Sequence, residues 1–311
     1  MDKQNKNVLV LGGTGFHGSH ALRIAKNKGY DVYSISRREG IDIRDYPSFT
    51  KHLKEIQPDA IIDCAGHEGS VHYVNAHAAE VAYDTFQMAL NIYRAATEVC
   101  PQAKIINALG NCSYPGDTTV AKESEWLTGP VHDSVLASGM EKRVKYVLAA
   151  SYHKQHGIRS VNWIMSNCYG PGAGTDPNKL HALNGIIIRL IKAQKNKDKT
   201  FEIWGTGMPI REWVYAEDAA GMLVDSVELP EQIYPINFAQ NKGYSIKEIA
   251  ELAAKELNYP VRFTFDISKP DGAPVKILDN TEFRKKYPKY EFTPIEKGIR
   301  KTIEYYKTVL A

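Results

Sequence analysis

The stretch Val8-Leu9-Val10-Leu11-Gly12-Gly13-Thr14-Gly15-Phe16-His17-Gly18 decides the fold. Its first four residues form a short apolar run between polar residues and glycines, which predicts a buried strand. The glycines then follow the spacing G-x-x-G-x-x-G and open a helix. This arrangement lets the backbone approach a pyrophosphate closely and offers it the N–H groups of a helix amino terminus. A tight turn without a ligand is the alternative. We predict that a dinucleotide is bound by Gly12, Thr14, Gly15, Phe16 and Gly18.

The rest of the first half alternates strand with helix. Further strands are predicted at Asp31–Ser36, Ala60–Cys64, Lys104–Ala108 and Ser160–Met165. Helical stretches lie between these strands. One of them carries apolar residues at helical spacing from Ala82 to Ala96. The alternation predicts an α/β fold with a doubly wound parallel sheet of the Rossmann type. We expect residues 1–169 to form mainly the dinucleotide-binding domain, and 170–311 mainly a smaller α/β substrate-binding region with segments returning to the first.

The end of the second strand indicates which dinucleotide binds. An acidic residue there would bond the ribose 2′-hydroxyl of NAD. This chain has Ser36-Arg37-Arg38 instead, and Asp42 and Asp45 come too late for that role. Arginine pairs with phosphate through a two-pronged contact, so the segment favours the 2′-phosphate of NADP and makes NAD the lesser candidate. A solvated basic turn is the alternative.

Composition excludes several classes of protein. The chain has 311 residues, 43% hydrophobic and 24% charged, which suits a large packed core and argues against disorder. Its net charge of +3 does not indicate a nucleic-acid binder. No signal peptide or membrane-spanning run is evident, no metal site is predicted, and the four cysteines are scattered without a C-x-x-C pair. We therefore expect a cytoplasmic protein with reduced thiols.

Five segments of the chain resemble one family over nearly its whole length. They are Gly12–Gly18, Asn111-Cys112-Ser113-Tyr114-Pro115, Glu123-Ser124-Glu125, Asn167-Cys168-Tyr169-Gly170-Pro171 and Trp204-Gly205-Thr206-Gly207-Met208-Pro209-Ile210-Arg211-Glu212. They are similar to the extended short-chain dehydrogenase/reductases, and most closely to the GDP-L-fucose synthase family. That family epimerises GDP-4-keto-6-deoxymannose at C3 and C5 and then reduces C4 with NADPH. The resemblance also implies a homodimer, formed by the helices from about Ala82 and Met140.

The resemblance assigns roles to three residues. Cys112 and His181 match the family's base and acid, which act on opposite faces of the sugar during epimerisation. Lys142 matches the lysine that holds the nicotinamide ribose. The chemistry is reasonable in itself, since a carbon beside a ketone can lose a proton to a thiolate or an imidazole. A buried apolar cysteine and a surface histidine are the alternatives.

Two positions depart from the family pattern. The family's tyrosine, four residues before the lysine, falls on Ser138, and its serine falls on Gly110. Ser138 and Lys142 share a helix face. An aliphatic hydroxyl is a far weaker acid than a phenol, so Ser138 is poorly suited to deliver a full proton during hydride transfer. It can still donate a hydrogen bond to a developing oxyanion.

Three functions remain open at this point. The first is a C3/C5 epimerase of a nucleotide sugar, for which a GDP-4-keto sugar is favoured, with weakened or lost C4 reductase activity. The second is an NADP-dependent GDP-sugar C4 reductase, dehydrogenase or bifunctional enzyme, in which water or Tyr114, His132 or Asp133 relays the proton. The third is a non-catalytic NADP-binding protein, for which replacing Cys112 would change nothing measurable.

The substrate residues follow mainly from the resemblance. Arg211 matches the arginine that holds the substrate diphosphate, and Arg189 and Lys276 are weaker candidates for the same role. Asn167 resembles the asparagine that contacts the sugar. Trp204 packs on the nucleotide or in the core. The guanine base is inferred from the family alone, so uracil and thymine nucleotides stay open.

Overall fold

The structure is a computed structural model that describes residues 5–176, 179–269 and 271–311. The chain forms two compact units whose segments interleave along the sequence. The first comprises Met1–Ser113, Val131–Ile164 and Glu217–Ile236. The second comprises Tyr114–Pro130, Met165–Ala216 and Asn237–Ala311. The glycine-rich loop and the helix with Ser138 and Lys142 belong to the first unit, and His181 and Arg211 belong to the second.

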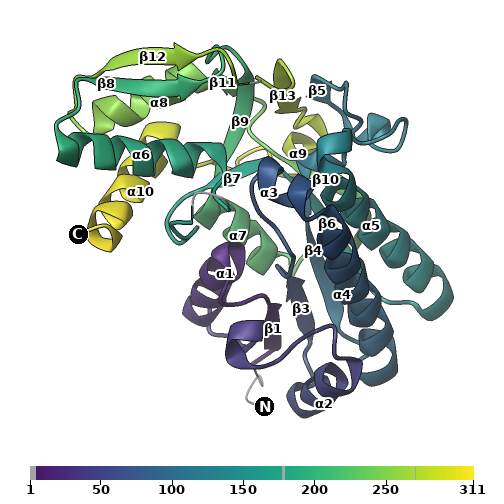
Figure 1. Cartoon of the computed structure of the whole chain (residues 1–311). Coiled ribbons are helices and arrows are strands. Elements are labelled where there is room, and N and C mark those ends of the chain that lie inside the picture. The colour runs from purple at the N-terminus through teal and green to yellow at the C-terminus, as the bar shows by residue number, and fades with distance from the viewer. Residues whose placement is uncertain (1–4, 177–178, 270) are drawn as a thin grey trace. The chain divides into compact units, whose positions relative to one another are not determined.

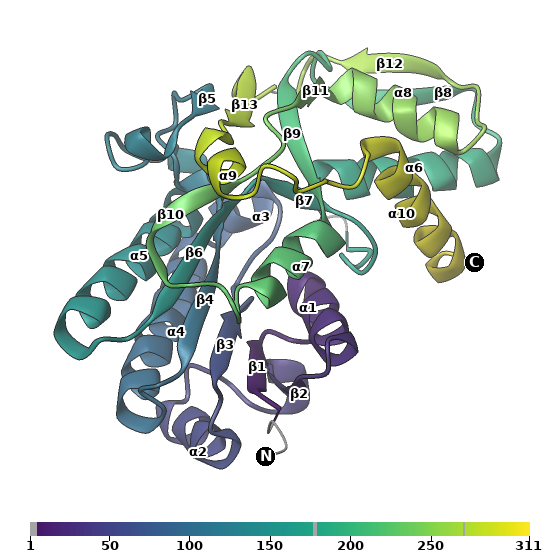
Figure 2. The same ribbon diagram turned by 180° about the vertical axis from the view of Figure 1, so that it is seen from behind.

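A six-stranded sheet organises the first unit, in the order β10-β6-β4-β3-β1-β2 (Figures 1 and 2). Its strands are β1 (Asn7–Leu11), β2 (Asp31–Ile35), β3 (Ala60–Asp63), β4 (Lys104–Gly110), β6 (Ser160–Met165) and β10 (Gln232–Phe238). The pairs β1–β2, β1–β3 and β3–β4 are parallel. The central strands are buried on both faces, which is why they read as continuous apolar runs. The predicted doubly wound sheet and its predicted strands are confirmed.

Helices cover this sheet. They are α1 (Phe16–Asn27), α2 (Tyr46–Ile56), α3 (Val71–Ala76), α4 (Ala78–Val99), α5 (Leu136–His156) and α7 (Ala216–Asp225), with the 3-10 turns η1 (Arg37–Glu39), η2 (Asn111–Ser113) and η4 (Asp133–Val135). Helices α4 and α5 lie side by side along the strands, with α2 against α4 (Figures 1 and 2). Ion pairs join α1 to α7, from Arg23 to Glu217 and from Lys28 to Asp225.

Two smaller sheets belong to the second unit. One has the order β11-β9-β13-β5, with β7 also paired to β9, and the other pairs β12 with β8. The strands are β5 (Val120–Ala121), β7 (Asn167–Tyr169), β8 (Thr200–Trp204), β9 (Ile210–Tyr215), β11 (Gly243–Ser245), β12 (Arg262–Asp266) and β13 (Val275–Leu278). Strand β9 runs beside three others, so its residues are fixed from both sides.

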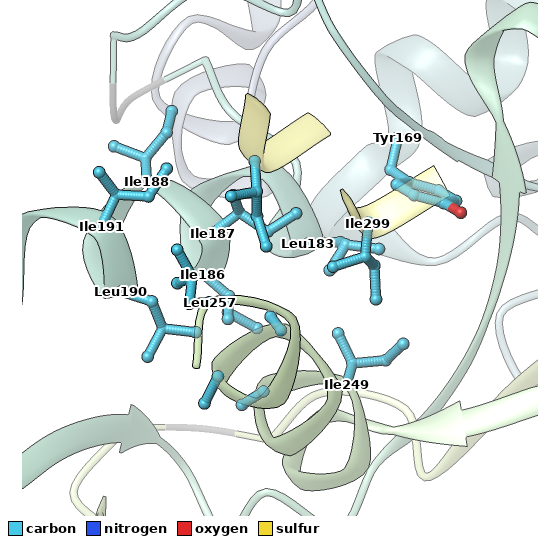
Figure 3. Packing of buried hydrophobic residues seen from close by; sticks show 14 of the residues in the cluster. Tyr169, Leu183, Ile186, Ile187, Ile188, Leu190, Ile191, Ile249, Leu257 and Ile299 are labelled. Carbon is cyan, nitrogen blue, oxygen red and sulfur yellow. The ribbon is translucent and has the colours of Figure 1, made fainter. Parts of the chain in front are cut away.

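A separate apolar core holds the helices of this unit together. The helices are α6 (Ala182–Asn196), α8 (Ile246–Glu256), α9 (Thr281–Lys286) and α10 (Ile295–Val309), with the 3-10 turn η3 (Glu123–Glu125). Isoleucines and leucines of α6, including Ile187 and Leu190, pack with Ile249 of α8 and Ile299 of α10 (Figure 3). Because the α6 residues recur at helical spacing, one face of that helix is almost wholly apolar.

Two general features complete the fold. Among the described residues, no helix has both the length and the apolar character needed to cross a membrane. The cysteines Cys64, Cys100, Cys112 and Cys168 are all free thiols.

Candidate active site

The glycine-rich loop forms a backbone cradle at the start of α1. Gly12 has φ +73°, and a Cβ there would lie 2.8 Å from the carbonyl oxygen of Cys64. A Cβ at Gly18 would lie 2.2 Å from the carbonyl oxygen of Gly12, so helix and loop touch through bare backbone. Gly15 is the N-cap residue of α1, and no side chain caps this helix end. A helix start without a side-chain cap and a close backbone are suited to a pyrophosphate, and the binding of a dinucleotide by this loop remains a prediction.

The end of β2 places both basic and acidic groups beside this loop. Thr14 Oγ1 donates to Ser36 Oγ at 3.0 Å, which ties the loop to the strand end. Arg37 and Arg38 follow in η1 and are exposed. The Glu39 carboxylate accepts hydrogen bonds from Ser34 at 2.8 Å and from Ser36 at 2.5 Å. Sequence reasoning passed over Glu39, whose charge now stands next to the two arginines.

Cys112 lies in η2, directly after β4, where a loop normally leaves the carboxyl edge of a parallel sheet. A Cβ added at Gly110 would lie 3.4 Å from Cys112 Sγ and 3.7 Å from Lys142 Cε. The Cys112 thiol and the Lys142 side chain therefore both lie next to Gly110, the glycine that stands at the family's serine position. Helix α5 approaches η2 closely because position 139 is glycine, since a Cβ there would be 2.6 Å from the Cys112 carbonyl oxygen.

The first turns of α5 bury polar residues. Ser138, Glu141, Lys142 and Lys145 all lie on its inner face, while Val147 is 55% exposed. Ser138 takes the tyrosine position of the family pattern and is buried. Its hydroxyl has no hydrogen-bond partner among the residues the structure describes. A buried hydroxyl without a partner costs about 1–3 kcal/mol, so this atom is suited to meet a ligand.

A cluster of buried charges surrounds Lys142. Its ammonium lies 2.7 Å from Glu141 Oε2 and 2.7 Å from Glu68 Oε1. Lys145 lies 2.9 Å from Glu141 Oε1 and 2.7 Å from Asp63 Oδ2, at the end of β3. The buried part of this cluster, within the described chain, contains two anions and two cations, so its net charge is zero. The anions are Asp63 and Glu141, and the cations are Lys142 and Lys145.

These contacts fix the protonation states inside the cluster. Burial opposes the charge of Lys142, but Glu141 and Glu68 outweigh it and hold the pKa of Lys142 well above its usual value. Burial likewise opposes ionisation of Glu141, yet Lys142 and Lys145 lower its pKa. Burial also opposes the charge of Lys145, whose pKa Asp63 and Glu141 raise. All three groups are therefore charged at neutral pH, and the positive charge of Lys142 is already compensated by protein carboxylates.

The loop after β3 brings Glu68 to Lys142. Glu68 lies between Gly66 and Gly69, and its neighbour His67 is anchored on both ring nitrogens. His67 Nδ1 lies 2.9 Å from Asp84 Oδ2, and Nε2 lies 2.9 Å from the Tyr73 hydroxyl. A carboxylate only accepts hydrogen bonds, so Nδ1 carries a proton and donates it to Asp84.

A second unpaired donor lies beside Cys112. The side-chain nitrogen of Asn111 is buried and has no hydrogen-bond partner among the described residues. Asn111 belongs to η2, against which α5 packs with Ser138 in its first turn. Two buried donors and a thiol therefore line one region of the first unit. Such donors suit a carbonyl oxygen that becomes negative during reaction.

The three side chains considered as proton relays differ in their surroundings, and their role as relays remains a prediction. The Tyr114 hydroxyl donates to Asn237 Oδ1 at 2.7 Å in the second unit, which commits its proton there. His132 and Asp133 are exposed at the beginning of α5, and His132 Nδ1 contacts Ser134 Oγ at 2.8 Å.

In the second unit, His181 is the residue before α6. It is exposed and serves as the backbone N-cap, and its carbonyl accepts from Gly185. Nothing in the structure tests its assignment as the acid of the pair, which remains a prediction. Cys112 and His181 belong to different units.

Arg211 and Lys276 are direct neighbours across two strands. They pair in the parallel register of β9 with β13, and Tyr244 of β11 pairs with Arg211 from the other side. Burial lowers the pKa of Arg211, although Asp271 opposes this. One guanidinium nitrogen of Arg211 donates to the Ile210 carbonyl at 2.8 Å, and another would lie 3.5 Å from a Cβ at Gly272. Two adjacent cations form a site suited to a diphosphate.

Arg189 is engaged in a different way. Its guanidinium lies 4.8 Å from the Phe201 ring centre and 5.1 Å from that of Trp204, and it donates to the Glu202 carbonyl at 2.5 Å. Trp204 itself is 55% exposed, so it is not a core residue and its ring can receive a base. Asn167 donates its side-chain amide to the Glu212 carbonyl at 2.9 Å, which fixes its orientation.

Comparison with known proteins identifies the family to which the chain belongs. The sequence profile of the NAD dependent epimerase/dehydratase family matches residues 8–237. The chain belongs to this family. As in other extended short-chain dehydrogenase/reductases of this family, a glycine-rich loop opens a doubly wound sheet.

The relatives of this epimerase/dehydratase family member match nearly its whole length. A GDP-L-fucose synthase of Azorhizobium caulinodans is 28% identical over 312 residues, covering 98% of this chain and 97% of that protein. A GDP-L-colitose synthase of Yersinia pseudotuberculosis is 28% identical, covering 96% of this chain and 97% of that protein. The structure of a GDP-L-fucose synthetase from Naegleria fowleri bound to NADP has a TM-score of 0.89 at 25% identity, covering 99% and 96% of the two chains. The resemblance to GDP-L-fucose synthases is confirmed as homology.

Sequence reasoning missed the carboxylates of the site. Glu68 and Lys142 lie 74 positions apart, so no local pattern joins them. Glu141 and Lys145 are spaced i,i+4, which does indicate an ion pair, but such pairs usually face solvent. The burial of this pair depends on Asp63, which lies on another element.

Proposed function

We propose that this protein is a C3/C5 epimerase of a GDP-4-keto sugar whose C4 reductase activity is weakened or lost. The observation that carries the proposal is the meeting of Cys112 with Lys142 in a site where a buried serine hydroxyl replaces the tyrosine. Homology to GDP-L-fucose synthases supports the substrate class.

The site separates two reactions that the family combines. Enolisation beside a C4 ketone requires a base and donors for the developing oxyanion. Cys112 is the base candidate, and Ser138 and Asn111 are buried donors without protein partners among the described residues. Reduction at C4 requires a strong, tunable acid, which an aliphatic hydroxyl is not. His181 is the proposed partner that returns a proton from the other face of the ring.

The cradle of Gly12, Gly15 and Gly18 fits the pyrophosphate of a dinucleotide, and Arg37 and Arg38 favour NADP over NAD. NADP, when bound, supplies a nicotinamide for hydride transfer. Thr14 and Phe16 complete the proposed loop contacts, and Ser36 holds the strand end against Thr14. Lys142 is proposed to contact the cofactor ribose with an N–H group that Glu141 and Glu68 do not occupy.

Substrate binding is assigned to the second unit. Arg211 and its strand neighbour Lys276 are proposed to hold the diphosphate, and the exposed ring of Trp204 to stack on the base. Arg189 supports Trp204 from its cation–π position and is a weaker phosphate candidate, because its guanidinium is already engaged. Asn167 is proposed to contact the sugar.

The experiment follows solvent deuterium into the sugar. The purified protein is incubated with a GDP-4-keto-6-deoxyhexose in deuterated buffer, and NMR reports deuterium at C3 and C5 while absorbance follows NADPH. Deuterium at either carbon without NADPH oxidation is the expected result. Absence of exchange at both carbons would overturn the proposal.

One observation favours a second candidate, a GDP-sugar C4 reductase or a bifunctional enzyme. The lysine and the dinucleotide cradle are both retained, and the curated relatives are named as fucose and colitose synthases. Stopped-flow absorbance of bound NADPH decides between the two candidates. Loss of the nicotinamide band on adding substrate would favour redox chemistry over epimerisation alone.

We also propose a homodimer. Tyr83 and Leu90 on α4 are 69% and 48% exposed, and Leu136 and Val147 on α5 are each 55% exposed. Apolar side chains gathered on two adjacent helices suit a self-complementary contact. Analytical ultracentrifugation of Val147→Glu against the unaltered chain tests this, with a shift toward monomer expected.

A further inference from the structure

The Lys142 ammonium contacts two carboxylates that differ in their exposure to solvent. The Glu141 side chain is 1% exposed and is enclosed between Lys142 and Lys145. The Glu68 side chain is 42% exposed, although its Oε1 lies only 2.7 Å from the same ammonium. A carboxylate that is fully enclosed cannot reach a bound molecule, whereas the Glu68 side chain contacts the lysine through Oε1 and is accessible from solvent.

The loop that carries Glu68 is held in place from the side. His67 is bonded to the Tyr73 hydroxyl and to Asp84, and Asp84 also pairs with Arg44. The Tyr73 ring packs against Gly69, where a Cβ would be 2.5 Å from a ring carbon. The position of the Glu68 carboxylate is therefore set by built contacts on both flanks, as expected of a group that must meet a ligand in one geometry.

We infer that Glu68 is a further acid–base residue of this site, a second base beside Cys112 that removes a proton from the carbon beside the ketone of a nucleoside diphosphate 4-keto sugar. The inference rests on the proposed epimerase function and adds to it a residue that the family resemblance does not assign. It gives Lys142 a proton-carrying partner in place of the tyrosine that is absent at Ser138.

The chemical step is balanced without any co-reactant. The C–H bond beside the ketone breaks, its proton forms an O–H bond on Glu68, and the electron pair moves through the new C=C bond onto the C4 oxygen. Negative charge thereby passes from the carboxylate to the enolate oxygen, and Lys142 lies beside both. Ser138 and Asn111 donate to that oxygen. The reverse transfer, from Glu68 or from the Cys112 thiol, restores the C–H bond.

Glu68 and Cys112 both lie beside Lys142, so the site holds a carboxylate and a thiol that can each exchange a proton with the sugar. Carboxylates serve as the base for proton abstraction beside a carbonyl in several unrelated enzymes. The charged and titratable groups that bear on this pair are Lys142 and Glu141 of α5 and His67 of the same loop.

The experiment compares Glu68→Gln with the matched control Glu55→Gln, an exposed glutamate on α2. Each variant is assayed for deuterium exchange into a GDP-4-keto-6-deoxyhexose from about pH 4 to about pH 9, which spans the carboxyl and thiol ranges. NADP binding and melting temperature are measured in parallel to confirm that both variants are folded. Glu68→Asp, which keeps the charge on a shorter side chain, is the conservative variant.

We expect Glu68→Gln to lose exchange by about 10²–10⁴-fold while still binding NADP, and Glu68→Asp to recover part of it. Exchange by Glu68→Gln at the rate of Glu55→Gln overturns this inference and leaves the epimerase proposal standing. Absence of exchange in the unaltered protein overturns both.

Discussion

Replacement of Lys145 by methionine tests whether the buried charges are a single unit. The Lys145 ammonium lies 2.7 Å from Asp63 Oδ2 and 2.9 Å from Glu141 Oε1, and all three side chains are at most 3% exposed. Methionine has a similar length and flexibility but no charge, so packing is largely retained while both ion pairs are lost. Asp63 is then left without a cation, and Glu141 keeps only Lys142.

The magnitude follows from burial. Breaking a buried ion pair by removing one partner costs about 3–5 kcal/mol, because the remaining charge is both desolvated and unpaired. An unfolding entropy of about 2.1 cal/mol/K per residue over 311 residues gives about 0.65 kcal/mol per kelvin. We therefore expect Lys145→Met to lower the melting temperature by at least about 5 °C.

The loss should grow as pH rises. In the unaltered protein Lys142 and Lys145 lower the pKa of Glu141, so this stabilisation is present above the ordinary carboxyl pKa and lost as pH falls. In the variant Glu141 keeps only Lys142, so less of this stabilisation develops as pH rises. The difference in stability between the two proteins is therefore larger at about pH 8 than at about pH 5.

Urea unfolding followed by circular dichroism measures this difference at the two pH values. Lys154→Met, an exposed lysine on the same helix, is the matched control and should change stability by less than about 0.5 kcal/mol. Adding Asp63→Asn to Lys145→Met should restore part of the loss, because the stranded carboxylate is removed. A Lys145→Met protein as stable as Lys154→Met at both pH values would refute the charge cluster as described.

Three further predictions concern the loop, the cofactor and β9. His67→Ala should lower deuterium exchange about tenfold without moving its pH profile, because the substitution loosens the loop and leaves the Glu68 carboxylate unchanged. The control His72→Ala, at an exposed histidine, should not lower exchange. Arg38→Ala should weaken NADP binding, measured by calorimetry, by about 10–100-fold and NAD binding by less than about threefold, since only NADP carries the 2′-phosphate; equal losses would contradict the assignment. Burial raises the pKa of Glu212 to about 7. The free energy of unfolding should therefore fall by up to about 3 kcal/mol as pH rises from about 4.5 through about 7. Glu212→Gln should abolish this pH dependence in urea titrations.

The sequence predicted the parallel sheet well because its signal is local. Strands such as β1 and β3 are fully buried on both faces, so each appears as an uninterrupted apolar run beside a turn. The glycine-rich loop could be predicted for the same reason, since the close approaches at Gly12 and Gly18 involve neighbouring backbone. The interleaving of the two units is not local, and nothing in the composition of Tyr114–Pro130 separates it from the segments on either side.

The charged interior of α5 was harder to predict from sequence. Hydrophobic periodicity assumes that the inner face of a helix is apolar, whereas α5 buries Glu141, Lys142 and Lys145 and exposes Val147. Ionic residues are buried only when partners from elsewhere meet them, and those partners are Asp63 on β3 and Glu68 on the following loop. Sequence spacing contains no information on such meetings, so Lys142 could be found by resemblance and its carboxylates could not.

From the charge cluster we predict that a tyrosine placed at position 138 would not by itself produce efficient C4 reduction. A lysine lowers the pKa of a neighbouring phenol by its positive charge, but here the ammonium of Lys142 lies 2.7 Å from each of two carboxylates. A phenol at position 138 would therefore experience a lysine whose field is largely cancelled. The same pairing suits enolisation, because the lysine charge becomes available to the sugar oxygen when Glu68 takes up a proton. In the proposed function, Ser138 and Glu68 are thus two parts of one electrostatic arrangement, and we expect that arrangement to favour proton transfer at carbon over proton delivery to an alkoxide.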